Sequence, residues 1–267
     1  MSQPVLLVEY PDDAIALLTL NRPERRNALT IELMELLCEK LAVLALDPRR
    51  RVVILKGAGA AFCAGLDLQE SADLNTAERG AECVARSLQT LSQSPLVTIA
   101  AAHGAAFAGG AGLLACCDFV LGTPELRIAF PEVRRGLVPA LVGAILQDRL
   151  RDTDLRELFF LGEAIGAERA SAMGLLHRIV PVDQLAEEAR MLAAAILQGA
   201  PDAVRQTKRL LQELRSTPPA QRLTQALEFH KRARSSNEAR EGIAAFFEHR
   251  APNWKKSLSH ATVAIVW

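Results

Sequence analysis

Apolar and polar positions divide the start of the chain into two short strands and one helix. Residues 5–9 and 14–20 are rich in aliphatic side chains and predict two strands, with a turn at 10–13 that contains one proline and two aspartates. Apolar residues then recur at helical spacing up to about Leu46, and Thr30 stands where an N-cap is expected. This part of the chain therefore predicts a β-hairpin followed by an amphipathic helix.

Further apolar runs alternate with helical patterns over the next hundred residues. The predicted strands are 52–55, 95–102, 119–122 and 126–129, and the predicted helices are 70–93 and 111–117. Beyond residue 140 the chain is expected to be mostly helical, and its last third is amphipathic. Because strands and helices alternate, the fold class is predicted to be α/β.

Composition and charge narrow the class of protein. Half of the 267 residues are hydrophobic, which is enough for a sizeable core, and Lys+Arg and Asp+Glu both number 31. A net charge of zero gives no overall attraction to nucleic acid or acidic lipid. No apolar run reaches the ~18 residues of a membrane span, and the start of the chain has no signal-peptide pattern. We therefore expect a cytoplasmic protein with no membrane partner.

Cysteines and histidines predict neither a disulfide framework nor a metal site. The five cysteines form no C-x-x-C, and the five histidines are scattered without ligand spacing. Cys63 is a candidate nucleophile by residue type, but no histidine pattern supports that role. We therefore expect no metal and no catalytic thiol.

Two loops rich in glycine and alanine, 59–68 and 103–112, each follow a predicted strand. Small residues let a ligand approach the backbone, and free N–H groups of two such loops can form an oxyanion hole. Tight turns and close packing explain the same glycines equally well. Residues 110–115 also fit the dinucleotide fingerprint G-x-G-x-x-A, but residues 103–109 separate them from the strand.

Glu132 is the carboxylate best suited to proton transfer. It lies within Phe-Pro-Glu-Val, where apolar neighbours raise a carboxyl pKa. The alternative is a structural glutamate near a helix start, or an ion pair with Arg134 or Arg135, and spacing alone favours that alternative. The same two arginines are candidate partners for a carboxylate on the substrate.

Several segments, in order along nearly the whole chain, resemble the crotonase (enoyl-CoA hydratase/isomerase) superfamily. They are 21–29, 62–68, 104–118, 130–139, 167–176 and 241–254. The resemblance implies a spiral of ββα units followed by a helical region through which three copies assemble, often paired into hexamers. We accordingly expect a core with the acyl-CoA site at 1–198, a trimerisation region at 199–256 and a tail at 257–267.

The resemblance also implies a substrate and a site. Members bind acyl-CoA thioesters, so coenzyme A enters as part of the substrate and no separate cofactor is expected. By position, Leu66 and Gly109 would supply the two N–H groups of the oxyanion hole. The CoA path would include Ala28, Ala64, Asp67 and Leu68. Asp118 matches a family aspartate that we interpret as structural.

One position departs from the best-known hydratases, which use two glutamates. Glu132 matches one of them, and Gly112 stands at the other. A single glutamate suits two reactions, the addition of water across the C2–C3 double bond of an enoyl-CoA and the Δ3–Δ2 isomerisation of that bond. Similarity to hydratases of branched or glutaconyl-type acyl-CoAs favours a hydratase, a lyase of fatty acid metabolism. Gly112 also predicts a roomier pocket near the acyl β-carbon.

Residues 201–234 carry a local basic charge that suggests a role outside catalysis. They hold eight Lys and Arg against three acids, a net charge of +5, and some members of the superfamily bind RNA. A solvated helix pair facing the trimer, or contacts to CoA phosphates, also explains this charge. Phe229 is the only aromatic residue there, so bases have little to stack on. We therefore predict an enzyme rather than an RNA-binding or inactive member.

Overall fold

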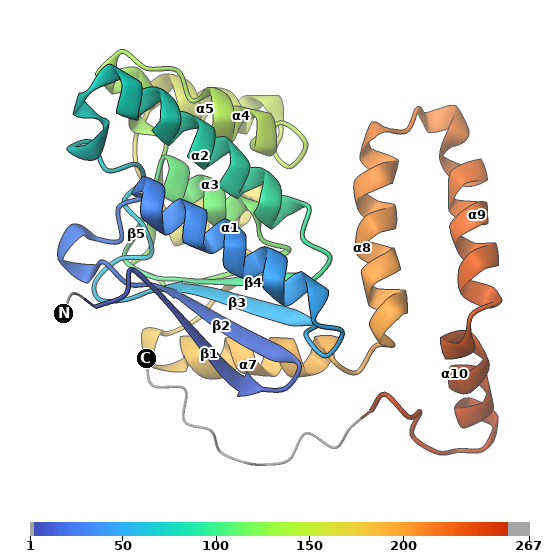
Figure 1. The fold of residues 1–267 in the computed structure, drawn as a ribbon. Coiled ribbons are helices and arrows are strands. Elements are labelled where there is room, and N and C mark those ends of the chain that lie inside the picture. Colours follow the sequence, from blue (N-terminus) through green and yellow to red (C-terminus); the bar gives the residue numbers. More distant parts are fainter. Residues whose placement is uncertain (1–2, 256–267) are drawn as a thin grey trace.

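Two β-sheets lie at the centre of the computed structural model, which describes residues 3–255 (Figure 1). The first pair of strands in the larger sheet is antiparallel, and the other neighbours are parallel. Its spatial order is β1 (Leu6–Asp12), β2 (Ile15–Leu20), β3 (Val52–Gly57), β4 (Val97–Ala102), β6 (Phe119–Gly122) and β9 (Arg178–Ile179). The inner strands β2, β3 and β4 are buried on both faces, which is why they consist of nearly continuous apolar runs.

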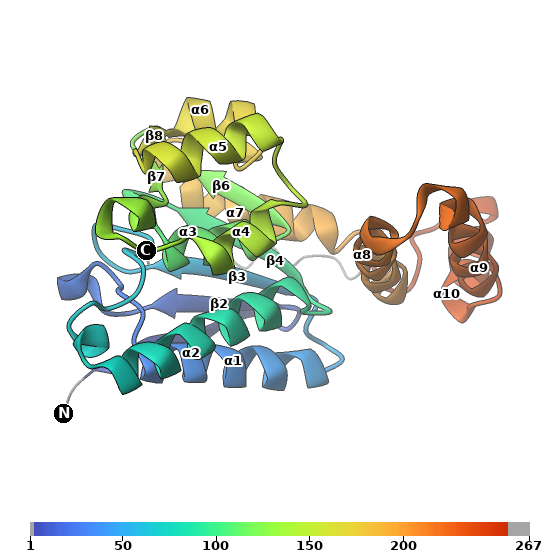
Figure 2. The same cartoon turned by 90° about the horizontal axis from the view of Figure 1, so that it is seen from above.

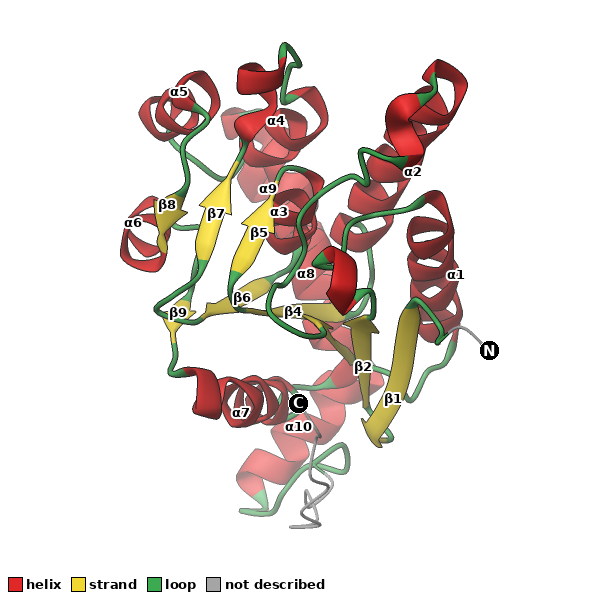
Figure 3. Cartoon of the chain, turned by 90° about the vertical axis from the view of Figure 1, so that its left-hand side faces the viewer, coloured by secondary structure: helices red, strands yellow, loops and turns green. Residues whose placement is uncertain are grey.

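The smaller sheet has the order β5 (Ala105–Phe107), β7 (Arg127–Ala129) and β8 (Ile165–Gly166). Consecutive strands alternate between the two sheets, since β4 and β6 belong to the larger sheet while β5 and β7 belong to the smaller one (Figure 3). Each of these strand pairs leads into a helix outside the sheets. The chain therefore winds as a spiral of strand, strand and helix, and the predicted fold class is confirmed.

Helices cover both faces of the larger sheet (Figures 1 and 2). α1 (Ile31–Leu46), α2 (Leu74–Ser92) and α3 (Gly109–Cys116) pack on one face, and α7 (Leu185–Ile196) packs on the other. The core is completed by α4 (Ala140–Leu146), α5 (Asp152–Leu161) and α6 (Ala167–Met173). The 3₁₀ turns are η1 (Pro23–Arg25), η2 (Glu70–Ala72), η3 (Pro131–Arg135), η4 (Val182–Gln184) and η5 (Pro219–Gln221).

The start of α1 matches its prediction, but the turn between β1 and β2 matches only in part. The N–H of Leu33 donates to Thr30 Oγ1 at 3.3 Å, which confirms Thr30 as the N-cap. The turn predicted at 10–13 is wrong in part, because β1 continues to Asp12 through a bulge after Glu9. β1 is an edge strand, where a proline removes no ladder hydrogen bond, so Pro11 does not end it.

Three helices form an arm that stands away from the core (Figures 1 and 2). They are α8 (Pro201–Ser216), α9 (Arg222–Arg234) and α10 (Asn237–Phe247), and they confirm the predicted helical C-terminal region. Three of the basic residues at 201–234 form ion pairs within the chain, with Asp118, Glu213 and Glu228 as partners. The predicted tail at 257–267 lies outside the described residues.

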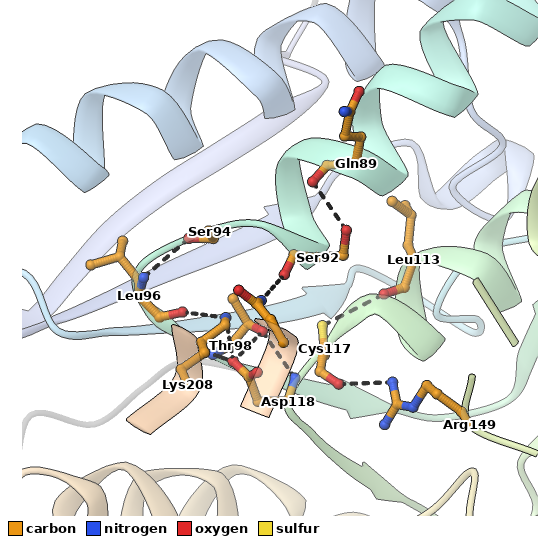
Figure 4. A network of polar contacts seen from close by, with 11 residues as sticks. Gln89, Ser92, Ser94, Leu96, Thr98, Leu113, Cys117, Asp118, Arg149 and Lys208 are labelled. Atoms are coloured by element: carbon orange, nitrogen blue, oxygen red, sulfur yellow. Dashed lines mark hydrogen bonds and ion pairs between the residues drawn. The ribbon is translucent and has the colours of Figure 1, made fainter. Parts of the chain in front are cut away.

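A buried lysine anchors the arm to the core (Figure 4). Lys208 of α8 is 8% exposed, and its Nζ lies 2.6 Å from Asp118 Oδ2 and 2.8 Å from the carbonyl oxygen of Leu96. The same carboxylate oxygen accepts hydrogen bonds from the N–H and the hydroxyl of Thr98. A buried cation persists when it is paired and hydrogen-bonded in this way, so Asp118 has the structural role that we expected.

No helix between residues 3 and 255 has the length and apolar character needed to cross a membrane. The cytoplasmic location expected from the sequence stays a prediction.

Candidate active site

Backbone hydrogen bonds hold the segment after η1 against the loop that follows β3. The N–H of Leu29 donates to the Gly65 carbonyl at 2.8 Å, and the N–H of Asp67 donates to the Leu29 carbonyl at 2.9 Å. The N–H of Ala64 donates to the Arg26 carbonyl at 2.9 Å. Ala28 and Leu66 are therefore carried by neighbouring segments.

The same loop is bonded on its other side to the segment that contains β5. The N–H of Cys63 donates to the Ala105 carbonyl at 3.0 Å, and the N–H of Phe107 donates to the Cys63 carbonyl at 2.9 Å. β5 in turn pairs with β7, and the Ala108 N–H donates to the Ala129 carbonyl at 2.8 Å. β7 leads directly to Glu132, so four adjacent segments converge on one region.

Leu66 and Gly109 carry free backbone N–H groups in this region. Within residues 3–255 neither group donates a hydrogen bond, whereas the N–H groups of the neighbouring Asp67 and Ala108 do. A Cβ at Gly65 would lie 2.8 Å from the Phe107 carbonyl oxygen and 3.1 Å from Ala108 Cβ, so the two loops are in contact. Gly109 is also the first residue of α3, where the helix dipole favours negative charge. This arrangement can stabilise an oxyanion.

Ala108 sets the direction of the Gly109 N–H. Its φ is 47° and its ψ is −122°, a backbone conformation that glycine adopts readily and alanine rarely does. Since ψ of residue 108 orients the peptide plane between 108 and 109, this strained conformation aims the Gly109 N–H. Sequence reasoning missed this role, because alanine normally indicates an unstrained position.

Glu132 lies on a rigid turn beside these loops. Pro131 starts η3, Gly136 ends it in the left-handed conformation, and the N–H of Leu137 donates to the Glu132 carbonyl. Carboxylate Oε2 of Glu132 is buried and has no hydrogen-bond partner within the described residues. Burial raises the pKa of this carboxyl, against smaller lowering effects from its own backbone N–H and the charge of Arg135. A carboxyl of this kind can take and return a proton near neutral pH.

Side chains from two other helices fill the space beside Gly112. A Cβ at this position would lie 2.9 Å from Val142 Cγ1 and 3.0 Å from Leu88 Cδ2. The direction in which a second glutamate would point is thus filled by two aliphatic side chains. The roomier pocket that we expected from Gly112 is therefore wrong at this position.

The four residues expected along the CoA path lie on the two segments that carry Ala28 and Leu66. Ala28 and Ala64 are half-buried, and Leu68 is 60% exposed. Asp67 Oδ2 accepts from Arg22 at 3.0 Å, and Oδ1 accepts from the Gln69 N–H at 3.1 Å. The carboxylate of Asp67 is therefore already engaged in holding its own loop.

Asn27 is a further site residue to which sequence reasoning gave no separate role. It is fully buried, with a left-handed φ of 55° that asparagine tolerates better than most residues. Its Nδ2 lies within 2.8–3.2 Å of the carbonyl oxygens of Ala58, Ala61 and Phe62. Asn27 thereby fixes the start of the loop that carries Leu66.

Other candidates for chemistry are excluded by their surroundings. Cys63 is buried and donates its S–H to the Asn27 carbonyl, and burial raises the pKa of its thiol to about 12. It is therefore not a thiolate at neutral pH. In the part of the chain that the structure describes, no three His, Cys, Asp or Glu side chains lie together as a metal would require.

A cleft of about 1160 Å³ lies elsewhere, between α8 and the core. It is lined by residues of α8 together with the ends of α3 and α4, and it contains none of the predicted site residues. The site proper is therefore defined by the converging loops and not by this cleft.

Comparisons with known proteins point to one family. A sequence profile of the enoyl-CoA hydratase/isomerase family matches residues 11–257. A putative enoyl-CoA hydratase of Thermus thermophilus is 36% identical over 253 residues, which cover 93% of this chain and 100% of that protein. The 2,3-dehydroadipyl-CoA hydratase of Escherichia coli is 30% identical over 250 residues, 93% of this chain and 98% of that protein. The crystal structure of an enoyl-CoA hydratase of Mycobacterium smegmatis aligns with a TM-score of 0.90 at 30% identity, over 95% of this chain and 100% of that one.

Replacing Ala108 with glycine should stabilise the protein. Glycine removes strain of about 1–3 kcal/mol and adds unfolded-state entropy of about 0.5–1 kcal/mol, so the net gain in unfolding free energy is about 1 kcal/mol. Urea unfolding measures it. The matched control is Ala106→Gly in β5, where φ is not positive, and it should lose stability. An equal loss in both variants would show that Ala108 is not strained.

Glu132→Gln should stabilise the protein at pH 8 and not at pH 4. Because the folded pKa of Glu132 is raised, its stabilising contribution is present below the unfolded pKa and is lost as pH rises through the folded pKa. Glutamine carries no charge, so the variant should gain about 1 kcal/mol of unfolding free energy at pH 8. This is the low end of the cost of an unsatisfied buried group, because Glu132 is only half-buried. Urea unfolding at both pH values, with the exposed Glu125→Gln as control, checks this. If the difference in unfolding free energy between Glu132→Gln and the wild type were the same at both pH values, the raised pKa of Glu132 would be contradicted.

Proposed function

Because the chain belongs to the enoyl-CoA hydratase/isomerase family, we propose that it adds water across the C2–C3 double bond of an enoyl-CoA thioester. The observation that carries the proposal is the pairing of β5 with β7, which brings the segment of Glu132 next to the segment of Gly109. Within the described residues Glu132 Oε2 is buried without a partner, and the N–H groups of Leu66 and Gly109 are free. Relatives named as hydratases that align over nearly the whole chain support it.

The two N–H groups act on the thioester oxygen. When water attacks C3, the electron pair of the double bond moves toward C2 and the carbonyl, so negative charge develops on that oxygen. Two preorganised donors stabilise this charge more than the neutral carbonyl, which lowers the barrier. The positive end of α3 at Gly109 acts in the same direction.

Glu132 performs both proton transfers. As a carboxylate it orients the water and takes one of its protons while the oxygen bonds to C3. It then returns a proton to C2, and the enolate collapses to the 3-hydroxyacyl thioester. One carboxyl suffices because it is regenerated at the end, so the glycine at 112 does not prevent hydration. Ala28, Ala64, Asp67 and Leu68 lie along the path of the coenzyme A portion.

Isomerisation is the second candidate, and the single carboxylate is the observation that favours it. Moving the double bond of a 3-enoyl-CoA to C2 requires removal of a C2 proton and its return at C4, and Glu132 can do both. One relative is named as an enoyl-CoA isomerase/hydratase, at 29% identity. We prefer hydration because hydratase names prevail among the more similar relatives.

The ultraviolet absorbance of the conjugated enoyl thioester distinguishes the two reactions. We expect the purified protein to remove this absorbance from a 2-enoyl-CoA, and Glu132→Gln to lower kcat by about 10²- to 10⁴-fold. Glu125→Gln, an exposed glutamate, is the matched control. A gain of absorbance from a 3-enoyl-CoA, with no reaction of the 2-enoyl-CoA, would replace hydration with isomerisation.

We also propose that the arm assembles three copies of the chain, or six as paired trimers. In the single chain its helices expose large apolar side chains to water, and an assembly would bury them. They are Leu211, Leu223, Leu227, Ile243, Phe246 and Phe247. The cleft between α8 and the core is a second surface that a neighbouring copy would fill.

Light scattering should therefore give a mass about three or six times 28.9 kDa. Leu223→Asp, which places a charge on an 85% exposed apolar position, should shift the protein toward monomers. A monomeric wild-type protein would contradict the assembly.

A further inference from the structure

The turn η3 that carries Glu132 has two faces with different neighbours. Val133 and Arg134 face the end of α5, since a Cβ at Gly162 would lie 3.3 Å from Val133 Cγ2 and from Arg134 Cγ. The guanidinium of Arg134 donates to the Leu161 carbonyl at 2.7 Å and to Glu163 at 2.9 Å. Arg134 is therefore committed to holding η3 against α5.

Arg135 lies on the other face, together with Glu132. A 3₁₀ helix has three residues per turn, so side chains at positions i and i+3 are eclipsed. Arg135 is exposed, and within the described residues it forms no ion pair or hydrogen bond. Its charge lowers the pKa of Glu132, which places the two groups within electrostatic reach. An arginine without a partner thus stands beside the acid/base.

The neighbours of Arg135 suit an acyl chain. Leu137 and Val138 follow it and are 56% and 78% exposed, so they offer apolar surface next to the free guanidinium. Glu132 acts at C2 and C3 of the acyl group, whereas the phosphates of coenzyme A lie on the other side of the thioester. Under the proposed function, a group beside Glu132 is therefore on the acyl side of the thioester and not on the side of the phosphates.

We infer that Arg135 binds a carboxylate at the far end of the acyl chain, so that the enzyme selects dicarboxylic enoyl-CoA thioesters. A guanidinium pairs with a carboxylate through two parallel hydrogen bonds, which gives both affinity and orientation. A neutral acyl chain leaves the guanidinium without a partner and gains nothing from it. The inference rests on the proposed function, because it takes Glu132 as the group that faces C2 and C3.

Binding of saturated thioesters tests this without requiring turnover. Calorimetry would compare three pairs of equal chain length: glutaryl- and pentanoyl-CoA, adipyl- and hexanoyl-CoA, and suberyl- and octanoyl-CoA. The wild type should bind the dicarboxylic member of at least one pair about 10- to 100-fold more tightly. Arg135→Gln should bring that ratio close to one, and Arg135→Lys should keep part of it.

Arg134→Gln is the matched control, and it should keep the wild-type ratio because its guanidinium is held by Leu161 and Glu163. A ratio near one in the wild type at all three lengths would overturn the inference, as would an equal loss in both glutamine variants. A dicarboxylic preference that Arg135→Gln abolishes, without hydration of any 2-enoyl-CoA, would overturn the proposed function while leaving the role of Arg135 intact.

Discussion

The buried amide of Asn27 is the constraint on which the site depends. It joins the turn after β2 to three carbonyl groups of the loop after β3, and its own Oδ1 accepts from the N–H of Arg22 at 2.9 Å. A fully buried amide is stable only when it is satisfied in this way, so one side chain fixes the relative position of two loops. Gly57 permits the contact, because a Cβ there would lie 2.7 Å from Asn27 Nδ2.

The hydrogen bonds of Asn27 position the first loop, and backbone pairing then positions the other segments of the site. The loop fixed by Asn27 bonds to the segment of β5, β5 pairs with β7, and β7 leads into η3. Two features along this path oppose stability: the strained backbone at Ala108 and the buried Oε2 of Glu132, which has no partner within residues 3–255. Both are what an enolate-forming site requires, a fixed N–H donor and a carboxyl of raised pKa, and the surrounding core compensates for them.

The sequence predicted those features that depend on local pattern. Thr30, the apolar strands β3, β4 and β6, and the helical arm all carry their own signals. β8 and β9 were missed because two residues show no periodicity, and β5 was missed because it lies within the glycine-rich stretch 103–112 that was predicted as a loop. Pro11 misled the hairpin prediction, since its effect depends on the strand being an edge. Gly112 misled the pocket prediction, because Leu88 and Val142 reach it from distant parts of the chain.

Some features of the candidate site were predicted from the sequence, and others are seen only in the structure. Spacing alone left the two glycine-rich loops undecided between tight turns and an oxyanion hole, and it favoured a structural role for Glu132. The roles of Leu66 and Gly109 came from the resemblance to a family, and the structure adds that their N–H groups are free within the described residues. The strain at Ala108 and the opposite faces of η3 have no signal in the sequence, because they depend on backbone angles and on contacts with α5.

The proposed reaction requires two backbone N–H groups and one carboxyl to converge on an enoyl thioester. A crystal structure of the Glu132→Gln protein with a bound 2-enoyl-CoA would show whether they do, because the variant should bind the substrate without converting it. We predict the thioester oxygen at about 2.7–3.1 Å from the backbone nitrogens of both Leu66 and Gly109, with C3 facing residue 132. A thioester oxygen bound by neither nitrogen, or a C3 turned away from residue 132, would rule out this arrangement.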